Sequence, residues 1–289
     1  MPAERALARW KGLSVLRILS ELMGLAAGAG FIGAISGLGG GVFIVPALVI
    51  WAKMPMRIAV GASLISVVAT SAGASVAFVR DGWTNLKIAM TLECATVTGA
   101  VIGAYLAGVV PTVVLEVLFA AMMIQSAYFT LTKGGDEIIA TGDPMAERLD
   151  LAGETIDDDG KLVHYAVINL GGGAALMVVA GLMSGLLGIG SGALKVIAMD
   201  YVMHVPLKVS SATSNFMIGV TAGAGALVFL SRGDISTTLA APVALGVTAG
   251  ALTGSRLLPR LKVEPLRIVF VIILILIAAE MGWRALSGI

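Results

Sequence analysis

Long apolar stretches separated by short polar turns make up most of the chain. In the first half they cover residues 22–52, 58–79, 87–110 and 114–132, and in the second half residues 170–202, 209–230, 236–256 and 266–283. Each stretch is near or above the roughly 20 residues that an α-helix needs to cross a bilayer. The pattern predicts an all-α polytopic membrane protein with about four membrane segments in each half.

The two halves are related in sequence. Residues 30–124 recur at 181–275 with a constant offset of 151 positions and no gap. Matched positions include glycines, prolines, serines and aromatics: Gly39/Gly190, Gly41/Gly192, Pro55/Pro206, Ser63/Ser214 and Phe119/Phe270. A doubled, apolar chain with a glycine-rich interruption in each half is typical of secondary transporters.

This repeat divides the chain into four regions: a basic N-terminal segment (1–21), a first membrane repeat (22–132), an acidic soluble linker (133–164) and a second membrane repeat (165–289). The basic segment resembles a signal peptide, but cleavage after its apolar continuation would destroy half of the repeat, so we expect it to be retained. The linker carries nine acidic and three basic residues. We interpret it as a solvated tether with a short helix near 144–151.

Composition agrees with the membrane prediction and excludes several functions. The chain is 58% hydrophobic and 13% charged, whereas a soluble domain is about a quarter charged. A net charge of +1 gives no electrostatic reason to expect a nucleic-acid partner. The single cysteine, Cys94, and two histidines offer no metal-ligand spacing, so we predict no cofactor. No serine–histidine, paired-aspartate or His-Glu-x-x-His arrangement is present, which argues against an enzyme.

The first segment of each half is too long for one upright helix. Residues 22–52 would form a helix of about 46 Å, against about 30 Å of hydrocarbon. The segment is either strongly tilted and kinked, or broken into two arms of a re-entrant hairpin. Four crossings per half would give parallel repeats, whereas three crossings plus a hairpin would give inverted repeats.

Glycines interrupt these long segments at GLGGG (37–41) and GIGSG (188–192). Each glycine costs a helix interior about 1 kcal/mol relative to alanine, so such clusters favour local unwinding. Freed backbone amides at a helix N-terminus can bind an anion. We therefore predict substrate contacts from Gly39, Gly40, Gly41, Gly190, Ser191 and Gly192. The alternative is close helix packing, because several of these glycines are spaced by four residues.

Several of these stretches together resemble the TauE/SafE permeases. They are GAISGLGGGVFIVP (33–46) and VGASL (60–64) in the first half, and GLLGIGSG (185–192) and ATSN (212–215) in the second. The resemblance covers about 22–132 and 170–283. It implies a multi-pass carrier in the cytoplasmic membrane of a prokaryote, acting on small sulfur-containing anions such as sulfite and organosulfonates. The second half departs from the first where Lys195 replaces Ile44 and Ile197 replaces Pro46.

Two charged residues lie within apolar segments. A cation at bilayer depth costs about 2.5–3.5 kcal/mol on insertion scales, so Lys195 should face a cavity or a partner, where it could attract an anion. The alternatives are that it reaches the interface or pairs with Asp200. Glu93, whose repeat partner is Ala244, could accept a transported proton, neutralise Lys195, or be a protonated core carboxyl.

Hydroxyl and amide groups complete the predicted substrate site. Ser63 and Ser214 coincide in the repeat, and Thr213 and Asn215 flank the latter. Helix capping is the ordinary explanation for serine and threonine at such places. We expect a secondary transporter of small anions that works by alternating access, with proton coupling through Glu93 as a hypothesis. The alternatives are an anion channel and a carrier of other carboxylates or oxyanions. The expected partners are the anion and the lipid bilayer, and a homodimer is left open.

Overall fold

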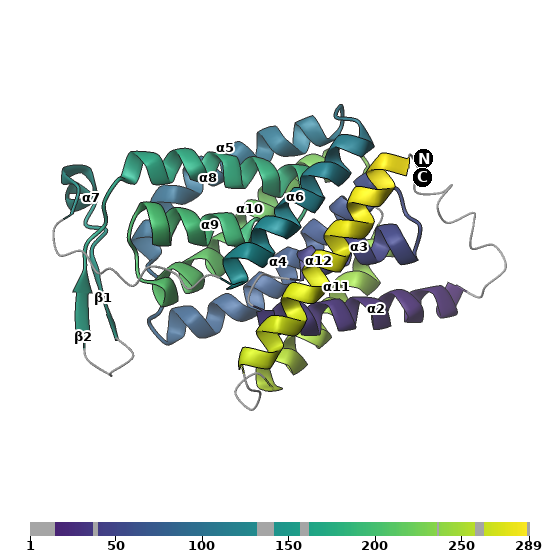
Figure 1. Ribbon diagram of the computed structural model, residues 1–289, viewed down its shortest axis with the longest axis horizontal. Coiled ribbons are helices and arrows are strands. Elements are labelled where there is room, and N and C mark those ends of the chain that lie inside the picture. The colour runs from purple at the N-terminus through teal and green to yellow at the C-terminus, as the bar shows by residue number, and fades with distance from the viewer. Residues whose placement is uncertain are drawn as a thin grey trace.

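Figure 1 shows a computed structural model, which describes residues 15–36, 40–131, 142–156, 162–235, 237–257 and 263–287. The first half contains α2 (Val15–Ser36), α3 (Gly41–Pro46), the π-helical turn η1 (Ala47–Trp51), α4 (Met56–Arg80), α5 (Leu86–Ala107) and α6 (Thr112–Leu131). The second half contains α8 (Leu170–Leu187), α9 (Gly192–Ile197), the π-helical turn η2 (Ala198–Val202), α10 (Leu207–Ser231), α11 (Thr237–Leu257) and α12 (Val263–Ser287).

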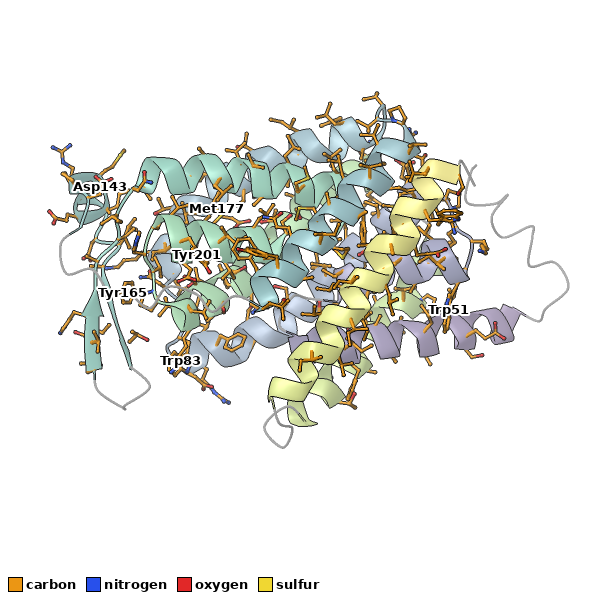
Figure 2. The ribbon with its side chains drawn as sticks, viewed as in Figure 1. Trp51, Trp83, Asp143, Tyr165, Met177 and Tyr201 are labelled. Atoms are coloured by element: carbon orange, nitrogen blue, oxygen red, sulfur yellow. The ribbon has the colours of Figure 1, made fainter. Side chains whose placement is uncertain are left out.

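Apolar length confirms the predicted polytopic membrane fold. Five helices within the described ranges are long and apolar enough to cross a membrane, namely α4, α5, α6, α8 and α10. Trp51, which precedes α4, and Trp83, which follows it, lie toward opposite ends of the molecule's long axis (Figure 2). Tryptophans at the ends of a long apolar helix are typical of the two membrane–water interfaces.

Helix boundaries follow the 151-residue offset. The helical elements α3, η1, α4, α5 and α6 begin 151 positions before α9, η2, α10, α11 and α12 respectively, and α2 ends 151 positions before α8. Positions that agree in sequence therefore also agree in local conformation. This agreement supports the predicted repeat.

Each half opens with two helical arms that fold back on each other. At the base of the second pair, the backbone N–H of Ile168, just before α8, donates to the carbonyl of Met203, just after η2 (3.3 Å). In the first pair, Leu22 of α2 and Ala52, after η1, line one apolar groove of about 880 Å³. The long first segments are therefore re-entrant hairpins, and three long helices follow each of them.

The two halves run in opposite directions. Helices α4 and α10 pack side by side: Gly225 lies against Leu64, and Gly219 lies against Ser71. Because the residue number falls on one helix as it rises on the other, the pair is antiparallel. Each of these helices directly follows its own hairpin, so the two hairpins start from opposite ends of the molecule. Of the two topologies left open by the sequence, the inverted one is found.

Glycines allow the hairpins to pack closely against the opposite half. A Cβ atom at Gly99 on α5 would lie 2.1 Å from the carbonyl of Val178 on α8. The equivalent Gly250 on α11 would place a Cβ 1.9 Å from the carbonyl of Ala27 on α2. Real Cβ atoms do not approach so closely, so only glycine permits these two crossings.

The acidic linker contains secondary structure of its own. It contains the short helix α7 (Pro144–Arg148), near the expected 144–151, and an antiparallel pair, β1 (Gly153–Ile156) and β2 (Leu162–Tyr165). Figure 1 places this unit at one end of the molecule. Leu151 and Tyr165 are buried against Ile88 of α5 and Met203 at the base of the second hairpin. Within the predicted linker (133–164), Leu151 is therefore an apolar anchor to the membrane helices, and Tyr165 directly after it is another. The description of the segment as a solvated tether stays a prediction.

Candidate functional site

The second glycine-rich stretch is a true break between two helices. Helix α8 ends at Leu187 and α9 begins at Gly192. Gly188 (φ +70°), Gly190 (φ +75°) and Ser191 (φ +50°) all adopt the left-handed conformation, which strains residues that have a Cβ. Helical hydrogen bonding cannot continue through such a segment, so the start of α9 leaves backbone N–H groups without intrahelical partners.

Glycines before the break have a different role. A Cβ at Gly181 would lie 2.0 Å from the carbonyl of Thr96, and one at Gly185 would lie 2.1 Å from the carbonyl of Ala100. These two glycines let α8 pack against α5. The two interpretations of the glycine spacing therefore apply to different positions: packing at 181 and 185, and unwinding at 188–191.

The two hairpins meet at Ser63 on α4. Its hydroxyl lies 2.8 Å from the carbonyl oxygen of Gly188 and 3.4 Å from that of Gly41, so one side chain contacts both hairpins. Gly41 is so close that a Cβ there would lie 2.9 Å from the Gly188 carbonyl. The equivalent Ser214 on α10 donates to the carbonyl of Gly192 at 3.2 Å. Both serines are buried, and both hold the start of a short helical arm.

A buried chain of polar groups joins the second hairpin to α5. Nζ of Lys195 donates to Oγ1 of Thr221 on α10 (2.6 Å), and this hydroxyl lies 2.6 Å from Oε1 of Glu93. The Lys195 side chain has no exposed area, and Glu93 is 8% exposed. This burial excludes the alternative in which Lys195 reaches the interface. The ammonium donates to Thr221, whose hydroxyl also lies next to the Glu93 carboxyl, so a buried group of opposite charge is close to it. Pairing with Asp200 stays a prediction.

The remaining predicted contacts fall into two groups. Gly40, Gly190 and Ser191 are buried at the broken segments together with Gly41 and Gly192, whereas Gly39 lies outside the described residues. The hydroxyl of Ser191 is buried and receives no hydrogen bond from any part of the chain that the structure describes. A ligand at the break could therefore bond to it.

The side chains of Thr213 and Asn215 bond to groups outside this cluster. The hydroxyl of Thr213 accepts a hydrogen bond from the backbone N–H of Asn85 (3.0 Å). The side-chain amide of Asn215 donates to the carbonyl of Ser211 in its own helix (3.0 Å). Both side chains support local structure here, so their role in substrate binding stays a prediction.

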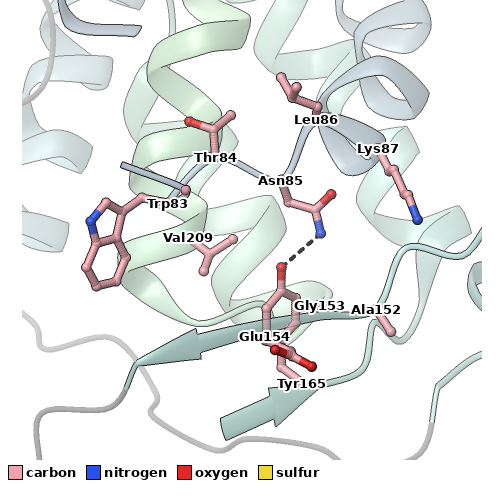
Figure 3. A pocket seen from close by; sticks show the side chains of 11 residues that line it. Trp83, Thr84, Asn85, Leu86, Lys87, Ala152, Gly153, Glu154, Tyr165 and Val209 are labelled. Carbon is pink, nitrogen blue, oxygen red and sulfur yellow. Dashed lines mark hydrogen bonds between the residues drawn. The ribbon is translucent and has the colours of Figure 1, made fainter. Parts of the chain in front are cut away.

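Asn85 organises the end of the molecule that bears the linker. Its side chain caps α5 by accepting from the N–H of Ile88, and it donates to the hydroxyl of Tyr165 (2.8 Å) and the carbonyl of Leu151 (3.0 Å). Figure 3 shows the Asn85–Tyr165 bond in a surface pocket of about 300 Å³ beside Trp83. Burial raises the pKa of Tyr165, while the hydrogen bond from Asn85 partly opposes that shift.

The opposite end is held by an ion pair. Arg232, after α10, bonds to Asp234 (2.7 Å) and donates to the carbonyl of Ala104 near the end of α5 (2.7 Å). The cation thus lies at the negative end of the α5 dipole. Arg57 donates to the carbonyl of Val110 in the turn that follows (3.3 Å). One end of the α4–α10 pair is therefore held by the hydrogen bonds of Asn85, and the other end by the charged side chains of Arg232, Asp234 and Arg57.

Comparison with known proteins identifies the family of this chain. The family described as "Sulfite exporter TauE/SafE" matches residues 22–281, which is most of the chain. The chain belongs to the TauE/SafE family. The "Probable membrane transporter protein YunE" of Bacillus subtilis (strain 168) is 26% identical over 276 residues, covering 93% of this chain and 98% of that protein. The "Probable membrane transporter protein ORF9" of Sinorhizobium sp is 28% identical over 241 residues, covering 83% and 82%. No solved structure matches.

Membership of the TauE/SafE family confirms the resemblance seen in the sequence. The chain is a multi-pass membrane transporter and not an enzyme, as its family and its relatives indicate. A transporter of this kind has a small-molecule substrate and a lipid bilayer as its partners. The role of each predicted site residue stays a prediction.

Thr221 and Asn85 were missed by the sequence analysis. Thr221 is one hydroxyl in an apolar helix, and its partners come from α5 and α9, which are far away in the chain. One signal was available: Thr221 is the repeat partner of Thr70. Asn85 could have been recognised as a helix cap at the start of 87–110, but not as the contact between linker and membrane helices.

Proposed function

We propose that this protein is a secondary transporter of small anions, with sulfite and two- or three-carbon organosulfonates as its substrates. The break at 188–191 carries the proposal. There α9 begins, with the positive end of its dipole and the buried Ser191 hydroxyl, and Lys195 follows one turn later on the same arm, with its ammonium bonded to Thr221. Half-helix N-termini that face anionic groups are a recurring feature of carriers. The family description supports sulfite among such anions.

Inverted hairpins support alternating access. One hairpin is rooted near Ala52 and the other near Met203, at opposite ends of the antiparallel α4–α10 pair. Movement of one half against the other would open the meeting point first to one side of the membrane and then to the other. The two ends are closed by separate contacts, Asn85–Tyr165 and Arg232–Asp234. Each closure can therefore break while the other stays intact.

Transport by purified protein in liposomes tests this proposal. We expect saturable uptake of labelled sulfite or sulfoacetate, and faster uptake when unlabelled anion is trapped inside the vesicles. Such counterflow requires a carrier that binds on one side at a time. Uptake without saturation or counterflow would favour the alternative of an anion channel. Preference for acetate or lactate would favour a carboxylate carrier with the same fold.

Proton coupling is assigned to Glu93. It is a buried carboxyl in the membrane region and is joined through Thr221 to the residue proposed to attract the anion. Intramembrane carboxyls of this kind serve as proton relays in transporters. We expect Glu93→Gln to abolish the acceleration of uptake by an inward proton gradient. Unchanged acceleration in this variant would remove Glu93 from the coupling step.

The cytoplasmic membrane of a prokaryote is the proposed location, in keeping with the bacterial sources of the relatives. Fractionation of cells that express the protein would test it. A homodimer also stays a prediction, and the mass of the purified protein–detergent complex would decide it.

A further inference from the structure

The hydroxyl of Thr221 is the only described group that joins the buried cation to the buried carboxyl. We propose that Thr221 is a positioning residue that couples proton movement to anion movement, so that one proton is carried with each singly charged anion. This inference rests on the anion transport proposed above and deepens it. It assigns a role to a fully buried residue of α10 that was not among the predicted site residues.

A threonine hydroxyl has one proton to donate. Nζ of Lys195 uses an oxygen lone pair of Thr221, so the Thr221 proton is free to point elsewhere. Two acceptors lie within reach: Oε1 of Glu93 at 2.6 Å and the carbonyl of Met217, in the same helix, at 2.8 Å. The hydroxyl therefore has two orientations. It faces Glu93 when that carboxyl is ionised, and it can turn to Met217 when the carboxyl is protonated.

Charge balance links these orientations to the anion. With Lys195 charged and Glu93 ionised, the buried site is neutral, and an anion entering alone would leave it with a net negative charge. A proton entering alone would leave a net positive charge. Either state is costly in a low-dielectric interior. Proton and anion entering together keep the site neutral, with the proton on Glu93 and the anion paired with Lys195.

Glu93 has a place for this proton. Its second oxygen, Oε2, is buried and receives no hydrogen bond within the described ranges. An ionised carboxylate with such an oxygen is costly, whereas a protonated one is not. The ionisable side chains on the elements packed around it are few. Helix α8 carries none, α10 carries Lys208 near its start with Arg232 just after its end, and the arm formed by α9 and η2 carries Lys195, Asp200 and Tyr201. Helix α5 itself also carries Cys94 and Tyr105. At the first turn of α5 lie Lys87 and its partner Asp150, with Tyr165 of the linker nearby.

The first half supplies a matched control. Thr70 is the repeat partner of Thr221, but its hydroxyl lies 3.1 Å from the carbonyls of Ser66 and Val67 in its own helix. The positions equivalent to Lys195 and Glu93 are Ile44 and Ala244. Replacing Thr70 therefore removes the same hydroxyl from an equivalent helix, but without touching a charged pair.

The experiment measures how many protons accompany each anion. Protein is reconstituted into liposomes containing a pH-sensitive dye, at zero membrane potential, and uptake of labelled isethionate, which carries one negative charge, is recorded with the proton signal. For the unmodified protein we expect one proton per isethionate. In Thr221→Val the ratio should fall roughly tenfold, the fold-change that loss of a hydrogen bond to a charged group brings. Thr221→Ser should restore the ratio, and Thr70→Val should keep it.

A ratio near one in Thr221→Val would overturn the inference and leave anion transport itself intact. Isethionate uptake without protons in the unmodified protein would also overturn it. If the unmodified protein carried neither isethionate nor sulfite, the proposed function would fail, and this inference with it. If the valine variant did not fold, Thr221→Ala would give the same comparison, because it also removes the hydroxyl.

Discussion

The two re-entrant hairpins share the same order of helical elements but differ in their buried charged side chains. In the second hairpin, Lys195 is buried and bonded to Thr221. In the first, the equivalent Ile44 is equally buried and apolar. Both arms begin at a glycine and continue into a π-helical turn at the same relative position. The repeat therefore preserves the geometry, and a single copy holds the charge.

This difference shows that the scaffold and the site can be altered separately. Glycine crossings and serine contacts recur in both halves, so their loss should harm the fold in similar ways on either side. The Lys195–Thr221–Glu93 chain occurs once, so its loss should affect transport in a way that no first-half substitution reproduces. Chemistry placed on a shared scaffold is common among proteins that evolved by duplication.

The largest effect is expected from making the second half resemble the first. Lys195→Ile should reduce anion uptake roughly 10- to 100-fold, because a charge-assisted interaction is lost. It should also lower the free energy of unfolding by about 1–3 kcal/mol, because Thr221 and Glu93 lose a buried hydrogen-bonded partner and Glu93 must bind a proton. Thermal unfolding and liposome uptake measure the two effects.

The double variant Lys195→Ile/Glu93→Ala separates them. Both buried charges are then absent, as at Ile44 and Ala244, so stability should largely recover while uptake stays low. Recovery of uptake in the double variant would mean that the charged chain has a structural role only.

Glycine crossings should respond alike in the two halves. Gly99→Ala and Gly250→Ala each force a Cβ to within about 2 Å of a backbone carbonyl, at 2.1 and 1.9 Å respectively. Overpacking of this kind costs about 1–3 kcal/mol, which thermal unfolding would detect. Gly73→Ala on α4 is the control, since a Cβ there meets nothing within 4 Å. If only one of the two crossings were sensitive, the halves would not share one packing plan.

The two repeated serines should differ in degree. Ser63 contacts the carbonyls of Gly41 and Gly188, whereas Ser214 contacts only that of Gly192. Ser63→Ala should lower the free energy of unfolding by about 1–3 kcal/mol, since the buried Gly188 carbonyl loses its donor and the nearby Gly41 carbonyl loses a polar neighbour, and Ser214→Ala by about 1 kcal/mol. Equal losses in a denaturant titration would contradict the central position of Ser63.

The smallest effect concerns the linker, which covers the base of the second hairpin. Tyr165→Phe removes the bond to Asn85 and should cost about 1 kcal/mol. Because burial raises the pKa of Tyr165 above its unfolded value, its contribution is complete below about pH 10 and is lost as pH rises further. The unmodified protein should therefore lose more stability than Tyr165→Phe between pH 9 and pH 11, values chosen to bracket the ordinary tyrosine pKa of about 10. Identical profiles would contradict this.

Sequence alone was sufficient for local features of the fold. Apolar length predicted the helices, and the glycine clusters predicted the break that Gly188, Gly190 and Ser191 form. It left parallel and inverted topologies open, because hydropathy does not show whether a long segment turns back. The α4–α10 contacts that decide between them join residues about 150 positions apart.

The same limit applies to the site. Lys195 and Glu93 could be singled out, because a charge in an apolar segment is visible in the sequence. Their link through Thr221 could not, since it depends on how three helices pack. Thr213 and Asn215 were grouped with Ser214 by adjacency, yet neighbours in a helix point about 100° apart and meet different partners.

Ligand-dependent stability of the purified protein tests the central claim most directly. A ligand that binds only the folded state raises its unfolding temperature. We predict that sulfite or sulfoacetate raises the unfolding temperature of the unmodified protein but not that of Lys195→Ile/Glu93→Ala, whose fold should be intact. An equal rise in both proteins would show that the anion binds elsewhere, and the charged hairpin would lose its assigned role.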